Sequence, residues 1–160
     1  MNVTINITAN VSVQSLQCSA SLSVTGGSLT LTKGSSEVIG SFAVGGGRSL
    51  SVNGAGTVFA ANGAASLNDA LLYAENGGVL SVPGVGQAAL IGENYLTWQA
   101  VGAGSRIVLA NLTNIIGDSL GRGYSWSLRA LNLIIAHIFF AEILIKCWNR
   151  NALCILRGDA

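Results

Sequence analysis

One short phrase recurs along this chain and constrains its fold more than any other feature. In each copy an alternating apolar segment meets a glycine-containing turn, and a second alternating segment follows. The copies span 22–31, 42–52, 72–82 and 98–109. Recurrence at roughly 20 to 30 residues is typical of solenoids, in which stacked units bury one continuous core. A partial copy at 50–60 overlaps the second, so we expect one coil to contain several strands joined by glycine turns.

The N-terminal segment alternates even more regularly. Between positions 3 and 13, β-branched and other apolar residues occupy every second position, and Asn, Thr and Ser occupy the positions between them. A period of two built from such residues indicates a half-buried strand. Leu16 and Cys18 extend the pattern toward the first glycine-turn unit.

Composition agrees with a chain of strands and tight turns. The sequence holds 21 glycines and one proline, half of its residues are apolar, and the glycines stand between the apolar segments. Glycine in that setting marks turns, because it tolerates positive φ and close backbone approach. Eight basic and seven acidic residues nearly cancel. Since no basic stripe is present to hold a phosphate backbone, we expect no nucleic-acid partner.

These patterns predict an all-β protein, a right-handed parallel β-helix. Residues 1–130 form the expected solenoid domain, with a core of Leu, Val, Ile and Ala. Its stability would come from each coil and from the contacts between neighbouring coils.

The segment 131–160 is expected to be a short hydrophobic tail, for which a helix is one open interpretation. Twenty of the 21 glycines precede it, and an aliphatic run replaces the glycine turn due in the fifth unit. Three interpretations stay open: a helix that caps the solenoid end, a membrane segment, or out-of-frame sequence in a truncated fragment. His137 and Glu142 leave a run free of ionisable groups that is shorter than the roughly 20 residues a bilayer needs. The abrupt loss of glycine in mid-unit favours out-of-frame sequence.

The segments 72–84 and 97–115 resemble repeats of very large bacterial surface or secreted proteins. The likeness is to filamentous-haemagglutinin-like and autotransporter-passenger-like right-handed β-helices, and it covers roughly residues 40–130. It implies export, extracellular or cell-surface display as part of a longer protein, and a role in adhesion or scaffolding. The first residues show neither a basic n-region nor an uninterrupted apolar h-region, so we expect no signal peptide in this chain.

We therefore expect a non-enzymatic repeat segment of an adhesin or structural scaffold. The alternative is a carbohydrate-active β-helix, a polysaccharide lyase or hydrolase fragment, which needs two carboxylates across the scissile bond. The acidic candidates are scattered over different units, where solvated turn or loop positions are expected, and they are Glu37, Asp69, Glu75, Glu93 and Asp118.

The other chemical candidates are equally sparse. His137 is the single histidine and lies in the tail, so no catalytic triad can be assembled. The cysteines Cys18, Cys147 and Cys154 match no common metal or redox spacing and are expected to be unpaired thiols. We assign no catalytic residue, cofactor site or metal site.

A binding face on such a solenoid would be long, shallow and directed to carbohydrate or protein surfaces. Its candidate exposed aromatics are Tyr73, Tyr95, Tyr124 and Trp126, which are equally plausible as stacking residues of the core. Membrane contact is expected only through residues 131–160, if at all. End-to-end self-association through the solenoid edges is a further expectation.

Overall fold

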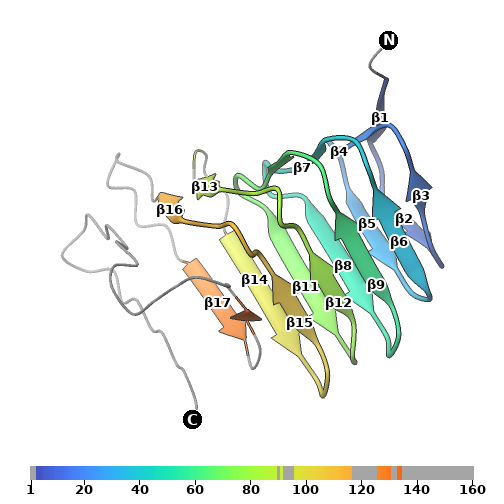
Figure 1. Ribbon diagram of the computed structural model, residues 1–160, viewed down its shortest axis with the longest axis vertical. Helices are drawn as coiled ribbons and strands as arrows, with labels where there is room; N and C mark the ends of the chain where they lie inside the picture. Colours follow the sequence, from blue (N-terminus) through green and yellow to red (C-terminus); the bar gives the residue numbers. More distant parts are fainter. Residues whose placement is uncertain (1–2, 90, 92–95, 117–125, 131–132, 135–160) are drawn as a thin grey trace.

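The computed structural model describes residues 3–89, 91, 96–116, 126–130 and 133–134 of the chain. Within those residues the secondary structure is entirely β, and every strand pairing is parallel. The chain winds repeatedly through the same sheets, so that strands from successive coils lie side by side (Figure 1). This confirms the expected parallel β-helix.

Three sheets, A, B and C, form the sides of the solenoid. A fourth sheet, D, consists of two strands. Sheet A contains β1 (Thr4–Ile7), β4 (Ser21–Val24), β7 (Phe42–Val44) and β10 (Ala65–Ser66). Sheet B contains β2 (Val11–Val13), β5 (Ser28–Leu31), β8 (Ser49–Asn53), β11 (Leu71–Glu75), β14 (Leu96–Val101) and β17 (Trp126–Ala130). Sheet C contains β3 (Gln17–Cys18), β6 (Ser35–Val38), β9 (Val58–Ala61), β12 (Val79–Ser81), β15 (Arg106–Val108) and β18 (Leu133–Ile134). Sheet D pairs β13 (Gln87–Ala89) with β16 (Asn114–Ile116).

The register of the sheets stacks like residues on like residues. In sheet B, Leu29 lies opposite Leu50, Leu50 opposite Leu72, and Leu72 opposite Trp98. All four side chains are buried. Because side chains alternate across a strand, this register directs one set of residues into the interior throughout the stack.

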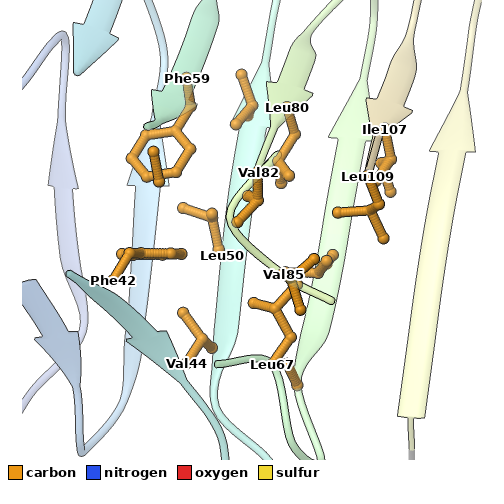
Figure 2. Packing of buried hydrophobic residues seen from close by; sticks show 14 of the residues in the cluster. Phe42, Val44, Leu50, Phe59, Leu67, Leu80, Val82, Val85, Ile107 and Leu109 are labelled. Atoms are coloured by element: carbon orange, nitrogen blue, oxygen red, sulfur yellow. The ribbon is translucent and has the colours of Figure 1, made fainter. Parts of the chain in front are cut away.

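The core is an uninterrupted apolar column enclosed by the three sides. Figure 2 shows side chains from different sheets converging on it, among them Phe42 of sheet A, Leu50 of sheet B and Phe59 of sheet C. The Phe42 and Phe59 rings pack with centroids 5.0 Å apart and planes tilted by 55°. That distance and tilt lie within the range favoured by aromatic pairs, which adds to the burial of their surface.

Glycine at one corner is required by the close approach of successive coils. At the turn between sheets C and A, Gly63 stacks on Gly40, and a Cβ on Gly63 would collide with the Gly40 carbonyl oxygen. The same Cβ would lie 2.8 Å from the carbonyl oxygen of Ile39. No side chain fits there, so the sequence uses glycine at this corner for space rather than for positive φ.

The structure places the copies of the recurring phrase at two different turns of the coil. The copies at 22–31 and 42–52 each run from sheet A to sheet B, through β4–β5 and β7–β8. The copies at 72–82 and 98–109 run from sheet B to sheet C, through β11–β12 and β14–β15. The true counterpart of the later copies is the segment 50–60, in β8 and β9. The expectation that one coil contains several strands is therefore confirmed, but some of the turns that join them contain no glycine and the four copies are not equivalent.

The alternating segment at the N-terminus also differs from the expectation. The expected single strand is two strands, β1 and β2, which belong to different sheets and are separated by residues 8–10. The alternation continues in phase through a turn that contains no glycine, so the sequence pattern does not show the corner.

The solenoid pairing reaches past residue 130. Strand β18 pairs with β15, placing Leu133 opposite Ile107 and Ile134 opposite Val108. Residues 135–160, which hold most of the expected tail, lie outside the described residues. Within the part that the structure describes, no helix is long and apolar enough to cross a membrane.

Candidate binding face

The outer surface of sheet B carries a mostly polar array of side chains that extends from β2 to β14. We call the outward residues of β5, β8, β11 and β14, together with Ser12 of β2, the binding face. The middle column of this face comprises Ser12, Thr30, Ser51, Tyr73 and Gln99. The flanking columns comprise Ser28, Ser49, Leu71 and Thr97 on one side and Asn53, Glu75 and Val101 on the other.

Tyr73 is the aromatic residue of the face. It lies in β11 with Ser51 on one neighbouring strand and Gln99 on the other. Its side chain is half-buried, whereas its neighbours along the strand, Leu72 and Ala74, are fully buried. Tyr73 therefore points out of the core, with part of its ring open to solvent.

A hydrogen-bonded polar cluster borders Tyr73 at the end of the strands. The side-chain amide of Asn53 donates to Oε2 of Glu75 at 3.4 Å, and that of Asn76 donates to Oδ1 of Asn53 at 3.0 Å. The three residues come from two adjacent coils, so the bonds tie the coils together as well as orienting polar atoms. This cluster was not predicted from the sequence, although Asn53 and Glu75 both follow a buried strand residue directly before a glycine turn.

The turns beside the cluster are fixed from within by buried hydroxyls. Thr57 Oγ1 donates to the carbonyl oxygen of Asn53 at 3.1 Å, and Ser105 Oγ donates to that of Val101 at 2.7 Å. Ser105 Oγ also accepts a bond from the backbone N–H of Gly77 at 2.9 Å, which links two coils. Buried hydroxyls with such partners hold the turn backbone in one conformation.

Charge is nearly absent from this surface. Glu75 is the one charged side chain among the described residues of the binding face. The hydroxyls, amides and one aromatic ring of this face provide hydrogen-bond donors, acceptors and a stacking surface, and Leu71 and Val101 add two apolar side chains in the flanking columns. Those groups suit a neutral polar ligand such as a polysaccharide chain.

The acidic candidates do not converge. Glu37 lies in sheet C, where its Oε1 accepts a bond from Asn62 at 2.8 Å. Glu75 lies in sheet B, and Asp69 lies at the corner between sheets A and B. Glu93 and Asp118 are outside the described residues. No group of three or more potential metal ligands occurs in the described ranges.

Asp69 differs from the expected solvated turn position. It does lie in the turn before β11, but its side chain is only 4% exposed. Its Oδ1 accepts a bond from the backbone N–H of Ile91 at 3.0 Å. The carboxylate thus bonds to the backbone of the next coil, a structural role that the sequence pattern did not reveal.

The remaining aromatic candidates are not placed. Tyr95 and Tyr124 lie outside the described residues. Trp126 begins β17, whose backbone pairs with β14, and Leu96 is its register partner. Of the four aromatics expected on a binding face, the structure therefore locates the side chain of Tyr73.

Comparison of the chain with protein family models, curated proteins and solved structures found no significant match.

Proposed function

We propose that this chain is a non-enzymatic repeat segment of a larger surface or secreted protein, an adhesin or scaffold whose binding face contacts polysaccharide. The proposal is carried by one observation: a half-buried tyrosine that lies between Ser51 and Gln99 on the mostly polar outer face of sheet B. Sugar rings stack on aromatic faces through their C–H groups and hydrogen-bond through their hydroxyls. Tyr73 with Ser51 and Gln99 offers both kinds of contact.

The rigidity of the sheet supports this role. A binding residue on a strand that is paired on both sides needs little ordering when the ligand arrives, so less of the interaction energy is lost. The column repeats one strand spacing at a time, about 4.8 Å per coil. A linear polymer lying along the solenoid axis would therefore meet several outward residues in succession.

Binding by the full chain to a panel of neutral and acidic polysaccharides, measured by affinity electrophoresis and calorimetry, tests the proposal. Tyr73→Ala should weaken binding about tenfold, which is about 1.4 kcal/mol. Tyr73→Phe should retain most of the affinity because the ring is kept. Val58→Ala, on the outer face of sheet C, is the matched control and should leave binding unchanged. Equal affinity of Tyr73→Ala and the parent chain would overturn the proposal.

The alternative of a carbohydrate-active enzyme makes a separate prediction. An enzyme would release new reducing ends or unsaturated sugars from a bound polysaccharide, and Glu75→Gln would abolish that release. We expect no product from the unmodified chain over prolonged incubation. Product formation that Glu75→Gln abolishes would replace the adhesin proposal with the enzymatic one.

Surface display is tested on cells. Antibodies raised against the purified chain should label intact cells of the source organism or appear in its culture medium. Labelling only after permeabilisation would contradict the proposed location.

A further inference from the structure

An asparagine directly before a glycine occurs at three turns of the solenoid. Asparagine is among the chemically labile residues of proteins. In an Asn-Gly pair the backbone nitrogen of the glycine can attack Cγ of the asparagine, because glycine has no side chain to obstruct the approach. All three pairs contain the same two residues, so their structural surroundings decide which of them reacts. The pairs are Asn53 with Gly54, Asn62 with Gly63, and Asn76 with Gly77.

Two of the glycine nitrogens are held by the neighbouring coil. The N–H of Gly54 donates to the carbonyl oxygen of Glu75 at 3.0 Å, and the N–H of Gly77 donates to Ser105 Oγ at 2.9 Å. Each nitrogen must lose this bond before it can attack a side chain. Because the bonds join successive coils, that loss requires a local opening of the solenoid.

The side chains of the same two pairs are also restrained. The amide of Asn53 donates to Glu75 Oε2 at 3.4 Å, and its Oδ1 accepts from the amide of Asn76 at 3.0 Å. These bonds fix the side-chain torsions of both asparagines. Neither side chain can turn toward the following glycine nitrogen until the bonds break.

The third pair lies at the corner between sheets C and A, where Asn62 follows β9. Its side chain is exposed, and its amide donates to Glu37 Oε1 at 2.8 Å. Among the described residues, the N–H of Gly63 has no hydrogen-bond acceptor. The attacking nitrogen of this pair is therefore not held by the neighbouring coils, in contrast to the nitrogens of Gly54 and Gly77.

We propose that Asn62 is a site of spontaneous deamidation and that hydrogen bonds between coils protect Asn53 and Asn76. The nitrogen of Gly63 forms a bond to Cγ of Asn62, and the bond from Cγ to Nδ2 breaks. The proton of the attacking nitrogen passes through water to the departing group, which leaves as ammonia. One water molecule then opens the five-membered imide at either carbonyl carbon. The products are aspartate and isoaspartate, and isoaspartate adds one carbon to the backbone.

Both products alter the contact between two coils. A carboxylate replaces the amide that donates to Glu37, so a hydrogen bond becomes a contact between like charges. Isoaspartate also lengthens the backbone at the corner where Gly63 stacks on Gly40 without room for a Cβ. Deamidation of Asn62 therefore loosens the coil of β9 from the coil of β6.

Peptide mass spectrometry of the full chain, incubated at neutral pH, tests the proposal by giving a deamidation rate for each asparagine. In urea, which unfolds the chain, the three asparagines should react at similar rates. In the folded chain, Asn62 should react about tenfold faster than Asn53 or Asn76, the effect of about one hydrogen bond. This comparison needs no variant, because each asparagine is a control for the others.

Ser105→Ala tests the protection of Asn76 directly. The variant removes the acceptor of the Gly77 N–H, so Asn76 should deamidate about tenfold faster, while Asn53 should keep its rate. Thr57→Val is the matched control, because it removes a buried turn hydroxyl that binds the Asn53 carbonyl oxygen and no glycine nitrogen. The rate of Asn76 should not change in this control.

Asn62→Asp reproduces one product and tests its effect on the corner. The variant should lower the Tm by a few degrees, because a second carboxylate lies beside Glu37. Adding Glu37→Gln should restore the Tm, since the glutamine amide can donate to the carboxylate at position 62. An unchanged Tm in Asn62→Asp would contradict the loosening of the two coils.

Either of two results would overturn the inference. One is a folded parent chain in which Asn62 deamidates no faster than Asn53 and Asn76. The other is a folded Ser105→Ala variant in which the rate of Asn76 is unchanged. Asn62 lies outside the binding face, so neither result bears on the proposed polysaccharide binding.

Discussion

Gly47 and Asp69 occupy one corner of the solenoid in successive coils. The backbone N–H of Gly47 donates to the carbonyl oxygen of Asp69 at 2.9 Å, and both residues have positive φ, 76° and 52°. Glycine adopts that conformation at no cost, while asparagine and aspartate are the residues that tolerate it best among those with side chains. The next coil therefore keeps the positive φ of the corner and gains a carboxylate that accepts a hydrogen bond from Ile91 of a further coil.

Substitutions of Asp69 separate two contributions to stability: the hydrogen bond that its carboxylate accepts and its tolerance of positive φ. Asp69→Asn keeps an acceptor for the Ile91 amide and tolerates positive φ, so it should cost under about 1 kcal/mol of unfolding free energy. Asp69→Ala loses the acceptor and strains the backbone, and about 3 kcal/mol is expected. Asp69→Gly relieves the strain alone and should fall between the two. Urea unfolding measures the stability of each variant. An alanine variant as stable as the asparagine variant would refute the expected order of stabilities.

Replacement by alanine should lower the free energy of unfolding by different amounts at two corner glycines. Gly63→Ala places a Cβ against the backbone of the neighbouring coil and should cost about 3 kcal/mol, since neither coil can move without breaking its ladders. Gly34→Ala has positive φ, 73°, but open space around the added carbon, so about 1 kcal/mol is expected. Thermal unfolding of the two variants measures the difference. Equal losses would show that close packing at the Gly63 corner is not what selects glycine.

The two buried hydroxyls at the turns between sheets B and C should contribute unequally to the free energy of unfolding. Ser105→Ala removes the acceptor of the Gly77 amide and should cost about 2 kcal/mol, because a buried donor is left unpaired. Thr57→Val removes only a donor to the Asn53 carbonyl, so about 1 kcal/mol is expected. Amide hydrogen exchange provides the specific readout. In Ser105→Ala the Gly77 amide should exchange faster, and unchanged protection there would contradict the assigned bond.

Trp98 carries the one buried side-chain nitrogen or oxygen without a hydrogen-bond partner in the described part of the chain, its Nε1. The ring is 1% exposed and continues the leucine column of sheet B. Trp98→Phe removes the unpaired donor together with some volume, so the two effects should offset to within about 1 kcal/mol. Trp98→Ala should cost about 4 kcal/mol. If the phenylalanine variant loses as much stability as the alanine variant, the indole N–H has a partner.

The solenoid itself was predictable because its signal is local. Alternation in segments such as 72–82 predicts strands, and the intervening glycines mark the corners. The assignment of each phrase to a corner was not predictable, because the same strand–glycine–strand pattern serves both the A-to-B and the B-to-C turns. The division between β1 and β2 was hidden for a related reason: Ala9 keeps the alternation in phase through a turn without glycine.

The candidate site was only partly predictable. Alternation places Tyr73 between the inward Leu72 and Ala74, which is enough to predict an outward ring. The cluster of Asn53, Glu75 and Asn76 depends on the register between two coils, and the burial of Asp69 depends on the position of Ile91. These are relationships between segments whose spacing varies from coil to coil, so no fixed sequence interval reports them.

Distances from pulsed electron spin resonance test most directly whether the middle residues of the binding face lie in one in-register column. With Cys18, Cys147 and Cys154 replaced, spin labels go on Thr30 and Gln99 in one protein and on Ser12 and Gln99 in another. Three and four strand spacings predict backbone separations of about 14 Å and about 19 Å. Narrow distributions that differ by about 5 Å between the two proteins are the expected result. Equal distances, or separations beyond about 30 Å, would contradict the stacked solenoid and the binding face built on it.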